Sequence, residues 1–260
     1  MTHHILDTEK NIPVDFDVFL EDIQNRDIIY IGEFHQVQEI LAFQIDIISG
    51  LLQRGFHPSI GLEMFNVLQQ EILDYYTEGV ITFEQLMNLY DMGPEGFDLK
   101  HYRNIIDIAL KNKLKAICLN IPRDIASSVA RHGLDRKELD GLYLNEQDIK
   151  NCSDAYKKAI GSVYKKHPHE EITEENFILS QSIKDEMMAE TIVHYLKTGN
   201  VRTPLIVITG RGHIEHWLGI PERVKGKMVR RGVCPSDVLI VAVHEDEYFV
   251  QNIADYIVFV

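Results

Sequence analysis

Residues 204–213 read PLIVITGRGH, a continuous apolar run that stops at a glycine-rich polar turn. The same arrangement occurs earlier in the chain, where residues 27–35 read DIIYIGEFH. An uninterrupted apolar run, rather than an alternating one, is typical of a strand that is covered on both faces, as in a parallel sheet between two helix layers. These two stretches therefore predict a buried parallel sheet with polar residues where its strands end.

Other short apolar runs fit the same sheet, and helical patterns lie between them. The expected strands are residues 27–31, 59–64, 114–119, 204–209, 237–243 and 256–260. The clearest expected helices are residues 36–53, 101–111 and 173–197. Alternation of strands with helices predicts an α/β fold with three layers (α/β/α) around a mostly parallel central sheet.

Two connections are too long for a simple crossover between neighbouring strands. We expect helical insertions at about residues 66–113 and 121–203. With 260 residues and no internal repeat, the chain is interpreted as one domain over residues 1–260, with its core motifs in residues 25–225.

Composition excludes several classes of protein. The chain has 26 Lys and Arg against 40 Asp and Glu, which gives a formal net charge of −14. A chain with this charge is repelled by nucleic acid and by anionic lipid, so neither is an expected partner. The longest apolar run, Val238 to Val243, is far short of the ~20 residues that a membrane-spanning helix needs.

The compartment is predicted from two further features. The first residues carry neither a signal peptide nor a lipoprotein leader. The three cysteines are widely spaced, with no Cys-x-x-Cys pair, which argues against a disulfide framework or a thiolate zinc site. We therefore expect a cytoplasmic protein.

Four of the expected strands run through or end in polar residues. They carry the sequences GEFH (32–35), GLEMF (61–65), NIPR (120–123) and GRGH (210–213). Since the carboxyl ends of parallel strands share one edge of a sheet, these residues should lie together. The predicted group is Glu33, His35, Glu63, Arg123, Arg211 and His213. Two antiparallel strands among the four would exclude this prediction.

Two of these turns share the spacing Gly-x-x-His, and each is a candidate for chemistry. Two imidazoles with carboxylates suit a divalent transition metal, with His35, Glu63 and His213 as the metal ligands. The same residues, together with Glu33, could act as general acid and base around a bound water. Either imidazole could instead face a larger iron cofactor.

Structural roles for these residues are the alternatives. Either histidine could be a hydrogen-bonded core residue, Glu63 could form an ion pair with an arginine, and Glu33 could cap a helix. Arg123, at the start of a helix after a proline, favours an anionic ligand or clamps an acidic side chain. Asp185 could approach the edge of the site from its helix, although a solvated helix surface is the commoner position.

Six stretches together resemble a known family. GEFH, GLEMF, HYRNIIDIA, NIPRDIA, QSIKDEMMA and GRGHIEHWLGIPERV occur in the order and spacing of the ChaN-like haem-binding uptake proteins of the Tiki superfamily. The resemblance covers roughly residues 25–225 and implies the EreA/ChaN-like fold, haem binding and a link to iron acquisition. The wider superfamily, which includes TraB/Tiki and erythromycin-esterase-like proteins, implies a metal-dependent hydrolase as the alternative.

The resemblance also implies roles for individual residues. Catalytic positions of the superfamily correspond here to Glu33, His35, Glu63 and His213, with Arg123 and Arg211 nearby. A tyrosine belongs to the haem-iron ligands of the family, and Tyr102 is the tyrosine inside a matching stretch. His216, just after GRGH, is a further candidate for binding the cofactor.

These residues and this resemblance are compatible with two functions from different classes. The first is a haem-binding protein, with a homodimer as one way to hold the haem. The second is a metal-dependent hydrolase of ester or peptide bonds that binds a small-molecule substrate and a divalent transition metal.

Overall fold

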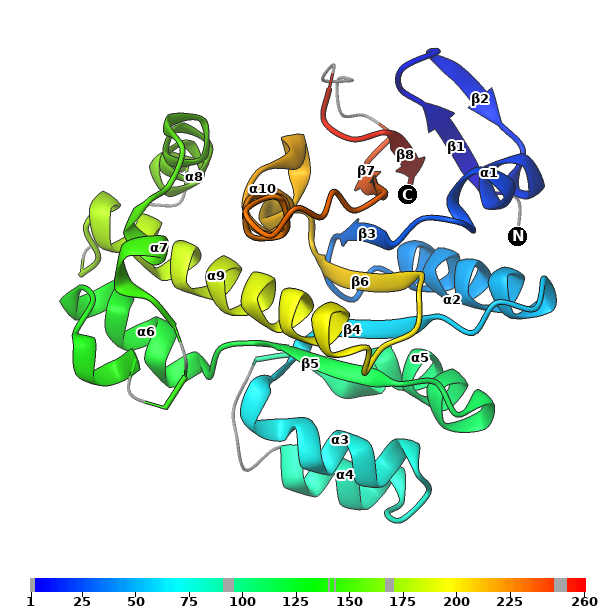
Figure 1. Cartoon of the computed structure of the whole chain (residues 1–260), viewed down its shortest axis with the longest axis horizontal. Coiled ribbons are helices and arrows are strands. Elements are labelled where there is room, and N and C mark those ends of the chain that lie inside the picture. The colour runs from blue at the N-terminus through cyan, green and yellow to red at the C-terminus, as the bar shows by residue number, and fades with distance from the viewer. Residues whose placement is uncertain (1–2, 91–95, 140, 143, 167–170, 246–251) are drawn as a thin grey trace.

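The computed structural model of the chain describes residues 3–90, 96–139, 141–142, 144–166, 171–245 and 252–260. Within these residues an eight-stranded sheet has the order β2-β1-β8-β7-β3-β6-β4-β5 (Figure 1). The strands are β1 (His4–Asp7), β2 (Ile12–Val14), β3 (Ile28–Glu33), β4 (Ser59–Asn66), β5 (Ala116–Asn120), β6 (Leu205–Gly210), β7 (Asp237–Val243) and β8 (Tyr256–Phe259).

The centre of the sheet is parallel, as the continuous apolar runs predicted. β3 pairs in parallel with β6 and β7, and β4 pairs in parallel with β5 and β6. The predicted α/β fold is therefore confirmed, and so is the common direction of the four strands that carry the polar turns. The antiparallel strands β1 and β2 at one edge were not predicted, because their short sequences HILD and IPV give no periodic signal.

Helices cover both faces of this sheet, which makes the three layers visible in Figure 1. Alternate residues of β3 pack on opposite sides. Ile29 and Ile31 belong to the core beneath α2 and α5, whereas Ile28 and Tyr30 belong to the core beneath α9 and α10. Because both faces are buried, the strand has no solvent-facing position, and this explains its uninterrupted apolar sequence.

The described α-helices range from five to twenty-five residues. They are α1 (Phe16–Ile23), α2 (Gln38–Gln53), α3 (Gln70–Thr77), α4 (Phe83–Tyr90), α5 (Leu99–Asn112), α6 (Arg123–His132), α7 (Glu146–Lys150), α8 (Asp154–Lys166), α9 (Glu174–Thr198) and α10 (Ile220–Val229). Short 3₁₀ turns are η1 (Val67–Gln69), η2 (Arg136–Leu139), η3 (Arg211–His213) and η4 (Glu215–Trp217).

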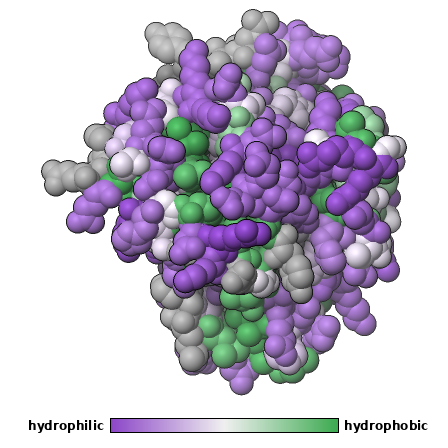
Figure 2. Space-filling view, turned by 60° about the vertical axis from the view of Figure 1, so that its left-hand side comes forward, coloured by the Kyte–Doolittle hydropathy of each residue, from purple (hydrophilic) through white to green (hydrophobic). Residues whose placement is uncertain are grey.

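The two long connections of the sequence hold α3 to α5 and α6 to α9. The longest of these helices, α9, begins after Thr173, whose hydroxyl accepts the amide of Asn176 as a cap. Figure 2 shows the side of the molecule on which α6 to α9 lie, where the surface is largely hydrophilic and hydrophobic residues gather in separate patches. None of the described helices is both long and apolar enough to cross a membrane.

Candidate functional site

The parallel strands bring distant residues to one edge of the sheet. Glu33 is the last residue of β3, Glu63 lies inside β4, and Gly210 is the last residue of β6. His35 and His213 follow β3 and β6 directly, and both line a cavity of about 390 Å³. In the structure, Glu33, Glu63 and His213 therefore lie together at one edge of the sheet, as the sequence predicted.

Glu33 holds one of the two imidazoles. Its carboxylate is 2 % exposed, and its Oε1 lies 2.9 Å from Nδ1 of His35. Gln44 donates to Oε2 of Glu33 at 2.6 Å, and the hydroxyl of Tyr102 donates to Oε1 at 2.5 Å. With Nδ1 directed at Glu33, the Nε2 atom of His35 is left for a ligand, and 37 % of this side chain is exposed.

The charge state of His35 follows from the same contacts. Burial alone would lower its pKa, but the hydrogen bond to Glu33 and the charge of Glu63 outweigh burial and raise it. Tyr102 is held in its neutral form, since burial and the neighbouring Glu33 raise the pKa of its phenol well above the usual range. Tyr102 is fully buried and its hydroxyl points at Glu33 rather than into the cavity.

The second imidazole, His213, has a carboxylate at each nitrogen. Nδ1 lies 2.5 Å from Oδ1 of Asp185, and Nε2 lies 3.4 Å from Oε1 of Glu63. Burial would lower the pKa of His213, but the charges of Glu63 and Asp185 raise it to about 10. This imidazole is therefore a cation at neutral pH, held between two buried anions.

Asp185 is the site residue that sequence left undecided. It is fully buried, and besides His213 it accepts the hydroxyl of Tyr156 at 2.5 Å. The i,i+4 spacing of Gln181 and Asp185 was the sequence signal for this position, because it puts both residues on one face of α9. In the structure that face is turned towards the cavity. Nothing in the sequence pointed to Tyr156 or to Gln44.

Glu63 is paired with an imidazole rather than with an arginine. Its Oε2 accepts the hydroxyl of Thr209 and the amide of Gly210, both at 2.6 Å. Burial would raise the pKa of Glu63, but the nearby His213 and these donors hold it well below its usual range. Glu63 is thus an ionised carboxylate that anchors the end of β6 as well as His213.

The two arginines and the third candidate histidine lie at different distances from the cavity. Arg211 lines it, with Nε 2.9 Å from Oε2 of Glu215 and its guanidinium 4.9 Å from the ring centre of Phe34. Arg123 is exposed at the start of α6 and is not among the residues around the cavity. His216 is also outside it, with Nδ1 3.3 Å from the carbonyl of Asn252.

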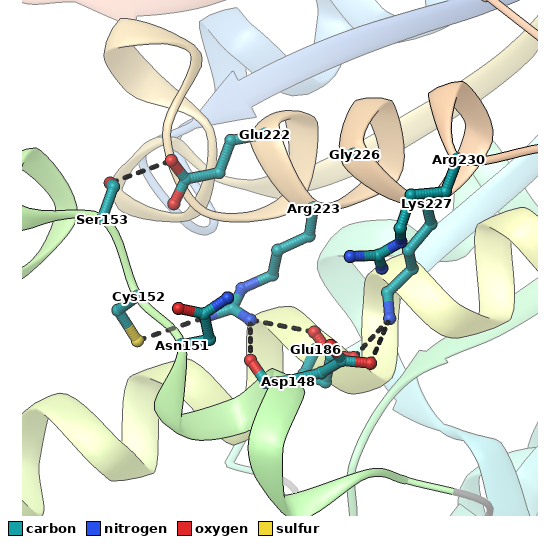
Figure 3. A pocket seen from close by; sticks show the side chains of 10 residues that line it. All are labelled: Asp148, Asn151, Cys152, Ser153, Glu186, Glu222, Arg223, Gly226, Lys227 and Arg230. Atoms are coloured by element: carbon teal, nitrogen blue, oxygen red, sulfur yellow. Dashed lines mark hydrogen bonds and ion pairs between the residues drawn. The ribbon is translucent and has the colours of Figure 1, made fainter.

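A compact group of possible metal ligands occurs elsewhere. In the described part of the chain, Asp148, Glu186 and Glu190 are the residues whose ligand oxygens lie within 4.8 Å of one another. The expected set of His35, Glu63 and His213 does not reach that spacing. The ammonium of Lys227 already lies 2.5 Å from Glu186, 2.6 Å from Glu190 and 3.5 Å from Asp148, so a cation occupies this carboxylate group. Figure 3 shows Lys227 beside Glu186 and Asp148.

One protein-family model matches most of the chain. The family model described as haem-binding uptake, Tiki superfamily, ChaN matches residues 19–224. A curated relative, Protein RETICULATA-RELATED 5, chloroplastic, from Arabidopsis thaliana, is 23% identical over 231 residues. The match covers 81% of this chain and 31% of that protein, so the chain spans about a third of the relative's length.

Two solved structures share the fold. The structure that describes cofacial heme binding to ChaN of Campylobacter jejuni is 20% identical, with 99% of this chain and 96% of that chain covered and a TM-score of 0.74. A variant of the erythromycin esterase EreC in its open conformation is 14% identical, with 94% and 77% covered and a TM-score of 0.52. At these identities the likeness shows a common fold.

Proposed function

The chain belongs to the ChaN family of haem-binding uptake proteins in the Tiki superfamily, and from this premise we propose that it binds haem in the cavity beside His35. The family makes haem the expected ligand. The cavity supplies two features that a haem site needs, namely an accessible imidazole and apolar side chains.

The observation that carries this proposal is the accessible imidazole of His35, which lines the cavity with 37 % of its side chain exposed. Gly210 packs against this imidazole, since a β-carbon there would lie 2.8 Å from Nε2 and clash with it. Histidines that bind a metal usually give their other ring nitrogen to a carboxylate, as Nδ1 of His35 does with Glu33. We therefore assign the iron to Nε2 of His35.

The other candidate ligands are less accessible. Both nitrogens of His213 face carboxylates, so His213 has no nitrogen left for an iron bond. Tyr102, which the family resemblance suggested, supports His35 through Glu33 in this proposal. Arg211 also lines the cavity, where Glu215 already pairs with its guanidinium.

The cavity does not enclose a ligand on all sides. Its apolar residues belong mainly to α8 and α9, so they would cover one face of a flat ligand. We include in the proposal a homodimer in which a second copy covers the other face.

A titration with hemin tests the proposal. The wild-type protein should develop a saturable Soret band, and His35→Ala should weaken hemin binding by at least tenfold and change the position of the band. His216→Ala is the control, since it removes an imidazole outside the cavity. A spectrum that stays that of free hemin would exclude haem binding.

One observation favours a second candidate, hydrolysis of an ester or peptide bond. Two imidazole–carboxylate pairs, Glu33–His35 and Asp185–His213, face one cavity, and such pairs can move a proton and stabilise negative charge. Here His35 would take the proton of a water that attacks the carbonyl. The donor types at His35, Glu63 and His213 also suit a divalent metal.

Metal analysis and an ester panel on one untreated preparation separate the two functions. Stoichiometric divalent metal and ester cleavage, both lost in His213→Ala, would support hydrolysis. Unchanged metal content and activity in that variant would exclude it.

A further inference from the structure

One face of α8 forms an apolar part of the cavity wall, here called the α8 wall. Ala159, Ile160 and Val163 line the cavity from this helix, and Phe177 of α9 and Leu218 lie beside them. Val163 is 44% exposed, whereas its exposed neighbours on α8 are mostly lysines such as Lys158 and Lys165. Val163 thus extends the apolar surface that these side chains form in the cavity, and an apolar surface inside a cavity suits an apolar ligand.

The helix that carries this wall is fixed to the rest of the site. Tyr156, at the start of α8, is 1% exposed and donates to Asp185, and the guanidinium of Arg223 lies 5.5 Å from the centre of its ring. The wall is therefore held in place before any ligand binds, and such pre-organisation reduces the entropy lost on binding.

Few groups in the cavity can bond to a metal at the centre of a ring. Nε2 of His35 is available, since its Nδ1 is the nitrogen that contacts Glu33. Both nitrogens of His213 face carboxylates, and the hydroxyl of Tyr156 donates a hydrogen bond to Asp185. A flat ligand would thus make one bond through its metal and many contacts through its apolar face. The contacts with the ring should dominate the affinity.

We propose that this cavity recognises the tetrapyrrole ring itself, so that the protein also binds porphyrin without iron. The inference rests on the proposed haem site and adds a ligand class to it. The α8 wall suits the ring that haem and protoporphyrin share.

The test compares protoporphyrin IX, followed by its fluorescence, with hemin, followed by its Soret band, on the full chain. We expect the two dissociation constants to lie within a hundredfold of each other. Val163→Glu should weaken both ligands at least tenfold, because it places a charge in the wall. Ser162→Glu adds the same charge one residue away, at an exposed position outside the cavity, and should leave both affinities unchanged.

His35→Ala completes the test, since it should weaken hemin and leave protoporphyrin IX unaffected. If hemin binds but protoporphyrin IX is more than a hundredfold weaker, the inference is wrong and the haem site stands. If neither ligand binds, the proposed function itself is wrong. Equal losses in Val163→Glu and Ser162→Glu would also overturn the inference, and Val163→Ser repeats the test if circular dichroism shows that Val163→Glu is unfolded.

Discussion

Two adjacent residues of α9 belong to two different clusters of buried charge. Asp185 faces the cavity, where it holds His213, and Glu186 faces the other way, where it accepts Arg223 at 2.8 Å and Lys227 at 2.5 Å. In the first cluster the cations are imidazoles, and one of them keeps a nitrogen open to a ligand. In the second, whose side chains are drawn in Figure 3, the cations are permanent and already paired.

The difference shows that buried charge alone does not identify a binding site. Arg223 also donates to Ser182 and to the carbonyl of Asp148, so its Nη atoms are occupied. This cluster joins α7, α9 and α10 and leaves little for a ligand to bind. The cavity cluster differs because the exposed His35 has one free nitrogen.

The largest expected effect is on the second cluster. Glu186→Ala removes the carboxylate, which is 1% exposed, and leaves Arg223 and Lys227 as buried cations without their main partner. Breaking a buried ion pair in this way costs about 3–5 kcal/mol of unfolding free energy. Chemical denaturation measures the loss, and hemin affinity of the folded protein should fall far less than in His35→Ala.

An equal loss of hemin affinity in Glu186→Ala would contradict the separation of the two clusters. Asp185→Asn is the matched change in the other cluster, one residue away and with the shape of the side chain kept. This variant should alter the cavity and its ligand binding.

The second prediction concerns pH. The pKa of His213 is raised from 6.5 to about 10 in the folded protein, so the folded state binds more protons than the unfolded state between these values. Its contribution to stability is complete below pH 6.5 and is lost as pH rises to about 10. Arg223 and Lys227, whose pKa values are raised above their already high usual values by the neighbouring carboxylates, should give no comparable change over this range.

Denaturation of wild type and His213→Gln at several pH values measures this effect. The difference in unfolding free energy between the two proteins should shrink steadily from pH 7 to pH 10, since glutamine does not titrate. A constant difference would show that His213 is neutral in the folded protein.

The parallel strands, and with them the meeting of His35 and His213, were predictable because long apolar runs and polar turns are local signals. The residues that form hydrogen bonds with the histidines and carboxylates of the site were not predictable. Asp185 and His213 are 28 residues apart, and Tyr102 and Glu33 are 69 apart. Their contacts depend on how helices of the long connections pack, and a buried tyrosine or aspartate has the same local pattern as a solvated one.

The third prediction compares two tyrosines that each donate to a buried carboxylate. Tyr102→Phe removes the donor to Glu33, and Tyr156→Phe removes the donor to Asp185. Each should cost about 2 kcal/mol, the usual range for a hydrogen bond to a charged group.

Bound hemin should separate the two variants. Without Tyr102, Glu33 becomes a stronger acceptor for Nδ1 of His35, and the more basic imidazole should lower the midpoint potential of the haem iron. Tyr156→Phe should leave the potential unchanged, because His213 does not bind the iron in our proposal. Equal shifts in both variants would contradict the assignment of His35 as the ligand.

The smallest expected effect tests how burial sets the strength of the second cluster. Glu190 and Glu186 bind the same ammonium of Lys227 at nearly the same distance, but their side chains are 31% and 1% exposed. Water can replace Glu190 as a partner, so Glu190→Gln should cost about 1 kcal/mol or less, against the several kcal/mol expected for Glu186→Ala. Chemical denaturation of Glu190→Gln beside Glu186→Gln, which makes the same change of atoms, isolates burial as the cause. Equal losses of unfolding free energy in the two variants would mean that the number of carboxylates around Lys227, and not their burial, sets the stability of this cluster. Burial could then not explain why the second cluster is more stabilising than an exposed one.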